Sequence, residues 1–179
     1  MSPVTRDLTA GDAQALRSFF LAMPAEDRTF FFQDVEDPAV AERWAGDERT
    51  VRRGAFDDSD QLVAFAALQP GTGWASHVAE VVLVVGPGAR RTGLGRGLAR
   101  EMLIAALRRG FRKVSVVIPA DNRGAVEMFQ KIGFDPEALL RDQLCSPHDG
   151  SLKDVVILAH LVDDTWTTLL SGGYEEAVG

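Results

Sequence analysis

The sequence predicts one mixed α/β domain, of the layered α/β or α+β kind, in which helices pack on a central sheet. One observation is the order of periodic segments in the central part of the chain: strand, strand, strand, helix, strand, helix, strand, strand. Another is the segment GPGARRTGLGRG, residues 86–97, which places five glycines and three arginines between an apolar run and a helical pattern. The 179 residues suffice for one buried core. We expect a single domain over residues 1–171 and a flexible tail over 172–179.

The composition limits the partners. The net charge is −7, from 19 basic and 26 acidic residues, which argues against nucleic acid and weakly favours cationic partners such as amines. The sequence has no apolar run of about 18 residues, so it predicts no membrane span, and its first residues do not resemble a signal peptide. We therefore expect a cytoplasmic protein without a membrane partner. Cys145 is the only cysteine, which excludes an internal disulfide and a cysteine-based metal site. We expect Cys145 to be buried and the protein to be a monomer or homodimer.

The N-terminal third predicts a strand and several short helices. Residues 3–8 form a candidate strand, and Thr9 with Asp12 three positions later has the pattern of a capping box. Apolar residues follow at helical spacing: Ala13, Leu16, Phe19 and Phe20. A further helix is expected after Asp37, with Pro38 at its first position. We expect the aromatic residues Phe30, Phe31, Phe32 and Trp44 to belong to the core rather than to a pocket.

The middle of the chain predicts three strands and the clearest helix. Residues 49–57 and 61–70 are candidate hairpin strands. The run AEVVLVV, residues 79–85, is nearly all apolar, so we expect a strand buried on both faces. A helix is predicted over residues 94–109, and Gly110 is its expected stop.

The C-terminal part predicts strand, helix and hairpin. Residues 113–120 are a strand, and residues 123–134 carry a helix together with its stop, in which Gly133 takes the left-handed C′ position and Phe134 the apolar contact after it. Residues 138–146 and 152–162 would pair across the turn SPHDG.

The glycine-rich segment at residues 86–97 has the properties of an anion site. Glycines let backbone N–H groups approach a ligand, and a helix N-terminus adds unpaired N–H donors. A phosphate-binding Walker A loop is rejected, because Leu94 stands at its lysine position and Gly95 at its hydroxyl position. The dinucleotide fingerprint is also rejected, because Leu98 stands at its third glycine position.

A third pattern, R/Q-x-x-G-x-G/A, is matched fully by Arg90-Arg91-Thr92-Gly93-Leu94-Gly95. Downstream, Asn122 opens N-x-x-A-x-x-x-F-x-K-x-G-F. With both motifs in a strand–helix–strand–helix context, the sequence resembles the GNAT superfamily of N-acetyltransferases over about residues 79–160. The N-terminal stretch also resembles the catalytic domains of bacterial protein-lysine acetyltransferases.

The resemblance implies a mainly antiparallel central sheet flanked by helices, with strands that splay apart at an acetyl-CoA site. It implies acetyl-CoA as the cosubstrate and no metal. The backbone of the strand before the loop would contact the cofactor, the N–H groups of residues 91–96 would hold its pyrophosphate, and the next helix would contact its arm. The implied cofactor-binding residues are Leu83, Val85, Arg90, Arg91, Thr92, Gly93, Leu94, Gly95, Arg96, Asn122 and Phe129.

Glu80 is the candidate general base. Several GNAT members have a glutamate at the equivalent place, and a carboxylate in a partly apolar cleft has a raised pKa that suits proton abstraction. Phe129 departs from the family, because many relatives have a tyrosine there that can protonate the leaving thiolate.

The implied reaction is direct transfer of an acetyl group from acetyl-CoA to a primary amine. A protein lysine is one acceptor that the resemblance suggests, and it would predict an open acidic groove beside Glu80. A small-molecule amine (a polyamine, an amino acid derivative or an aminoglycoside) would predict a closed pocket. A third alternative is an acetyl-CoA-binding sensor without catalysis.

Overall fold

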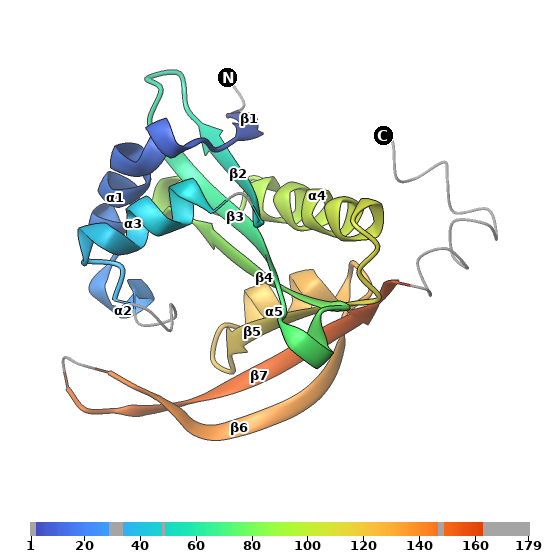
Figure 1. Cartoon of the computed structure of the whole chain (residues 1–179). Helices are drawn as coiled ribbons and strands as arrows, with labels where there is room; N and C mark the ends of the chain where they lie inside the picture. Colours follow the sequence, from blue (N-terminus) through green and yellow to red (C-terminus); the bar gives the residue numbers. More distant parts are fainter. Residues whose placement is uncertain (1–2, 29–33, 48, 147–148, 163–179) are drawn as a thin grey trace.

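A seven-stranded sheet forms the centre of the protein (Figure 1). The computed structural model describes residues 3–28, 34–47, 49–146 and 149–162. The strand order of the sheet is β1-β2-β3-β4-β5-β7-β6. The strands are β1 (Val4–Asp7), β2 (Val51–Phe56), β3 (Leu62–Pro70), β4 (Val78–Val85), β5 (Lys113–Pro119), β6 (Asp135–Cys145) and β7 (Leu152–Leu161). Neighbouring strands run antiparallel except β4 and β5, which are parallel. The predicted mixed, mainly antiparallel sheet is therefore confirmed.

Helices cover both faces of this sheet. They are α1 (Ala13–Ala22), α2 (Ala25–Arg28), α3 (Pro38–Gly46), α4 (Leu94–Arg108) and α5 (Arg123–Gln130). Figure 1 shows α1 and α3 on one side of the central strands and α4 on the other. Phe20 and Phe65 lie in the apolar cluster under α1 and α3, whereas Leu98 and Met102 lie in the cluster under α4. Two apolar layers thus hold the central strands between them.

Local signals placed most element ends correctly. Pro38 opens α3, and the Asp37 carboxylate accepts a hydrogen bond of 2.9 Å from the backbone N–H of Ala39. Gly110 and Gly133 have φ of 75° and 93°, the left-handed conformation expected just after α4 and α5.

The sheet opens between β4 and β5. Their parallel pairing runs only from Val78 opposite Lys113 to Val81 opposite Val116, although β4 continues to Val85 and β5 to Pro119. On its other side β4 stays paired with β3 as far as Val85. The backbone groups of β4 that face β5 beyond Val81 therefore lack a strand partner and must find other acceptors and donors. This is the splay that the family resemblance implied.

Two expectations about burial are wrong. The run that forms β4 is not buried on both faces, since every residue from Val82 to Val85 is only half-buried where the sheet opens. Cys145 is exposed rather than buried, because it ends β6 at the rim of the sheet.

The expected aromatic residues Phe30, Phe31 and Phe32 and the expected tail over residues 172–179 lie outside the described residues. In the described part of the chain, no helix combines the length and apolar character that a bilayer crossing requires.

Asp12 anchors the first helical turn. Its carboxylate accepts hydrogen bonds from the Thr9 backbone N–H at 2.8 Å and from two Arg6 nitrogens at 2.7 and 3.0 Å. Arg6 above all, and then Thr9, hold the pKa of Asp12 well below its usual value against the opposing effect of its burial. The predicted pairing of Thr9 with Asp12 is present, and Arg6 is the partner that the spacing did not indicate.

We expect Asp12→Asn to lower the free energy of unfolding at pH 7 by about 1.5–3 kcal/mol, the usual contribution of hydrogen bonds to a charged group. Because the pKa of Asp12 is lower in the folded state, its stabilisation is full above the unfolded pKa of about 3.9 and is lost as pH falls through the folded pKa. Urea unfolding of both proteins at pH 7 and pH 3 measures this, and the difference should shrink at pH 3. Asp135→Asn, at an exposed position of β6, is the control; an equal loss in both variants contradicts the expectation.

Candidate active site

A cavity of about 760 Å³ lies where β4 and β5 separate. Its wall comes from β4, the loop before α4, the end of β5 and the start of α5. Ten of the residues singled out from the sequence line it: Glu80, Leu83, Val85, Arg90, Arg91, Gly93, Gly95, Arg96, Asn122 and Phe129. Thr92 and Leu94 do not line it: the Thr92 hydroxyl donates to the Ala89 carbonyl at 2.8 Å within the loop, and Leu94 packs on the apolar cluster under α4.

The loop of residues 86–93 places the N-terminus of α4 at this cavity. Gly93 caps the helix with φ of 87°, and no atom within 4 Å would meet a Cβ there. The first helical hydrogen bond is donated by Gly97 to the Gly93 carbonyl, at 3.0 Å, so the N–H groups of residues 94–96 have no acceptor in the helix. Unpaired donors at the positive end of a helix dipole are suited to a phosphate group.

The three loop arginines do different things. Arg90 forms an ion pair with Asp27 of α2, and its Nε donates to the Val85 carbonyl at 3.0 Å. That side chain therefore fastens the loop to α2 and to the end of β4. Arg91 and Arg96 are exposed, and neither has an ion-pair partner among the described residues, so their guanidinium groups are available to an anion.

Gly95 allows the start of α4 to approach β4 closely. A Cβ at this position would lie 3.3 Å from Cγ2 of Val85 and 3.7 Å from Cδ2 of Leu83. The missing side chain thus lets the first turn of α4 lie directly against the unpaired end of β4. We call the N–H groups of residues 94–96 at the start of α4 the anion cradle. The anion cradle and the open strand edge border one cavity.

Glu80 lies on β4 on the side of α1 and α3. Val82 and Val84 pack toward the cluster under those helices, and side chains alternate along a strand, so Glu80 shares their face. Glu80 is half-buried, and among the described residues it has no ion-pair or hydrogen-bond partner for its carboxylate. Burial raises the pKa of the Glu80 carboxyl, because desolvation disfavours the charged form. A carboxylate of this kind is a better proton acceptor than a solvated one.

Asn122 and Phe129 close the α5 end of the cavity. Asn122 caps α5, and its Oδ1 accepts from the Ala125 N–H at 3.2 Å, which leaves its Nδ2 donors outside this cap. Phe129 is only 2% exposed and packs edge-to-face on Phe134, with ring centroids 5.1 Å apart. Phe129 is therefore mainly a core side chain whose ring forms part of the wall.

The sequence did not indicate Asp27 and Gln69 as residues of this cavity. Trp44, expected in the core rather than in a pocket, packs on the apolar cluster under α1 and α3 and also lines the cavity, so that expectation holds only in part. Gln69 stands directly opposite Glu80 in the β3–β4 ladder, a register that only the hairpin geometry reveals. Asp27 meets Arg90 across 63 positions of sequence. No group of three or more histidine, cysteine, aspartate or glutamate side chains that could hold a metal occurs among the described residues.

A sheet that opens between two parallel strands beside a glycine-rich helix N-terminus is the arrangement that the resemblance to acetyl-CoA-dependent acetyltransferases implied. The chain belongs to the acetyltransferase (GNAT) family, whose family model matches residues 17–134.

Three comparisons refine this. The chain is 28% identical to the [ribosomal protein bS18]-alanine N-acetyltransferase of Escherichia coli strain K12, over 70% of this chain and 85% of that protein. It is 30% identical to mycothiol acetyltransferase of Renibacterium salmoninarum over 45% of this chain, and it spans only a quarter of that protein's length. A phosphinothricin acetyltransferase of Sinorhizobium meliloti, solved in complex with acetyl-CoA, superposes with a TM-score of 0.76 at 16% identity, covering 90% of this chain and 89% of that one. That last likeness shows the shared fold.

Proposed function

We propose that this protein transfers an acetyl group from acetyl-CoA directly to a primary amine. The observation that supports it best is that one cavity holds both the anion cradle at the start of α4 and the half-buried Glu80 with its raised pKa. An anion cradle alone would serve a binding protein. A partly buried carboxylate in the same cavity is in addition suited to accept a proton from an ammonium group.

The residues present fit acetyl-CoA. The N–H groups at the start of α4, together with Arg91 and Arg96, would hold the pyrophosphate. The unpaired backbone of β4 at Leu83 and Val85 would bind the pantetheine arm, and Asn122 would contact the same arm. When bound, acetyl-CoA supplies an activated thioester.

Glu80 acts on the acceptor. An alkylammonium group with a pKa of about 10.4 is almost fully protonated at neutral pH, so the nucleophilic form is scarce. The Glu80 carboxylate accepts the proton, directly or through one water, and leaves a neutral amine. Phe129 has no proton to give, and a thiol with a pKa of about 8.5 can leave as the thiolate.

Two relatives support an amine acceptor. The E. coli relative is named for the alanine of a ribosomal protein, and the S. meliloti protein is named for phosphinothricin. We extend only the shared chemistry, acetylation of an amine, to this chain. Glu80 counts against a sensor without catalysis, since binding acetyl-CoA needs no base. The expected cytoplasmic location and the expected lack of a nucleic-acid partner rest on the sequence alone.

The test is a calorimetric titration with acetyl-CoA and, in parallel, with S-acetylpantetheine, which lacks the pyrophosphate and nucleotide. Loss of several charge-assisted hydrogen bonds should weaken binding by about a hundredfold or more. Release of CoA in the presence of a panel of amines then measures transfer. Equal affinity for the two ligands, or no binding of acetyl-CoA, would contradict the proposed cofactor site, and binding without transfer to any amine would leave the sensor alternative.

A further inference from the structure

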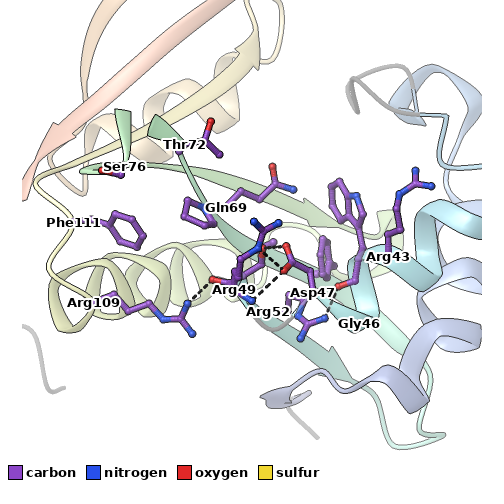
Figure 2. A pocket seen from close by; sticks show the side chains of 16 residues that line it. Arg43, Gly46, Asp47, Arg49, Arg52, Gln69, Thr72, Ser76, Arg109 and Phe111 are labelled. Atoms are coloured by element: carbon purple, nitrogen blue, oxygen red, sulfur yellow. Dashed lines mark hydrogen bonds and ion pairs between the residues drawn. The ribbon is translucent and has the colours of Figure 1, made fainter. Parts of the chain in front are cut away.

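A second cavity, of about 990 Å³, lies between the end of α3, the start of β2, the end of β3 and the residues after α4 (Figure 2). Its lining is strongly basic: among the residues that the structure describes, Arg43, Arg49, Arg52 and Arg109 stand against one carboxylate, that of Asp47. The chain as a whole has a net charge of −7, so four arginines in one cavity run against the composition. A concave site with a local excess of positive charge attracts anions.

This cavity adjoins the candidate active site. Trp44 and Gln69 line both cavities. Gln69 is opposite Glu80 in the β3–β4 ladder, and Arg52 is opposite Ala67 in the β2–β3 ladder. Residues directly opposite each other in antiparallel strands point to the same face, and so do residues two apart along one strand.

Arg52, Gln69 and Glu80 therefore share one face of the sheet on three successive strands, with Gln69 between the other two. The strand spacing puts the Cα atoms of Arg52 and Glu80 roughly 12 Å apart. The two side chains project from the same surface, so one small molecule can reach both.

The arginines keep most of their donors for a ligand. Arg52 donates one hydrogen bond to the Trp44 carbonyl, at 2.7 Å, while its Nε is buried without a partner among the described residues. Arg109 donates to the Arg49 carbonyl at 2.6 Å, and Arg49 pairs with Asp47 at 3.3 Å. Figure 2 shows these contacts around the centre of the cavity. A guanidinium has five N–H donors, and Arg49 and Arg109 are exposed and use only some of theirs in these contacts, so their remaining donors are open to an oxyanion.

We propose that this arginine pocket, formed by Arg49, Arg52 and Arg109, binds the carboxylate of the acceptor, and that the acceptor is a small amine of the amino acid class. The inference rests on the proposed function, because it assumes that the acceptor's amine lies at Glu80. A guanidinium matches a carboxylate or phosphonate with two parallel hydrogen bonds. The same charges disfavour a polyamine or a lysine-rich peptide.

The test compares matched acceptors by CoA release: the standard L-amino acids, their carboxamides, aminoalkylphosphonates, spermidine and a lysine-containing peptide. We expect kcat/KM for the preferred amino acid to exceed that for its carboxamide by about tenfold or more, as loss of a charge-assisted contact predicts. A phosphonate that surpasses every carboxylate would assign the pocket to phosphonates and overturn the carboxylate assignment.

Variants locate the effect in the pocket. Arg49→Gln and Arg52→Gln should each lower kcat/KM for the amino acid by about ten- to a hundredfold, mainly through KM, and lower kcat/KM for the carboxamide by a much smaller factor. Arg49 is 81% exposed in its side chain, so its replacement leaves folding intact even if Arg52→Gln does not fold. Arg141→Gln, at an exposed position on β6, is the control with the same change of charge.

Each other outcome has a distinct meaning. Equal rates with acid and carboxamide, or faster transfer to spermidine or the peptide, would overturn the anionic acceptor and keep the acetyltransferase. Binding of acetyl-CoA with no transfer to any amino acid would also overturn it. Failure to bind acetyl-CoA would contradict the proposed function itself.

Discussion

Gly93→Glu is expected to abolish binding of acetyl-CoA, with a rise in the dissociation constant of about a hundredfold or more. Gly93 caps α4 with φ of 87°, a backbone conformation that is strained for residues other than glycine, asparagine and aspartate. The space around it is open, so the new carboxylate enters the cradle, competes for the N–H groups of α4 and repels phosphate. Calorimetric titration measures the loss.

Gly93→Asn is the matched control. Asparagine tolerates the left-handed conformation and brings no charge, so we expect a much smaller change in affinity. Thermal unfolding of the variants checks that both are folded. If the glutamate variant binds acetyl-CoA as the wild type does, the start of α4 is not the pyrophosphate site, and the cavity beside β4 must bind something else.

Glu80→Gln is expected to lower kcat by about 10²–10⁴-fold, the usual contribution of a positioned base, while the affinity for acetyl-CoA stays the same. The amide keeps the size of the side chain but does not accept a proton. The variant should not be less stable at pH 7: burial raises the pKa of Glu80, so its ionised form is a desolvated charge that opposes folding above the ordinary pKa of a glutamate.

The pH dependence gives a second readout. In the wild type kcat/KM should rise with pH as Glu80 of the free enzyme loses its proton, and desolvation moves this rise above the ordinary glutamate pKa. The glutamine variant should lack that limb. Glu42→Gln, at an exposed position of α3, should keep both rate and profile. An unchanged kcat in the Glu80 variant would mean that another group, or none, removes the proton.

The sequence predicted those features that short stretches encode. Helix stops at Gly110 and Gly133 depend on a backbone conformation that glycine adopts without strain, so a single residue marks them. The glycine-rich motif around Gly93 is also a local pattern, whereas Glu80 was chosen through the family resemblance that this motif carries. The order of strands and helices was therefore accessible without any knowledge of long-range contacts.

Features that depend on contacts between distant segments could not be predicted from the sequence. The pair of Arg90 with Asp27 joins positions 63 residues apart, and no periodicity encodes it. The apolar run of β4 suggested burial on both faces, but an apolar strand beside a ligand cavity has the same composition as one in a core. The arginine pocket joins Arg49 and Arg52 to Arg109, which lies 60 positions after Arg49, so only the folded arrangement shows that these charges meet.

The early end of the β4–β5 ladder also has a consequence for dynamics. Amides of β4 that lack a strand partner should exchange their hydrogens with solvent faster than those of the β3–β4 ladder. A cosubstrate that lies along this edge takes the place of the missing strand and slows that exchange. It binds only the folded chain, so at a hundredfold excess over its dissociation constant it adds about 2.7 kcal/mol to the free energy of unfolding. The free energy of unfolding would then rise with the concentration of the cosubstrate.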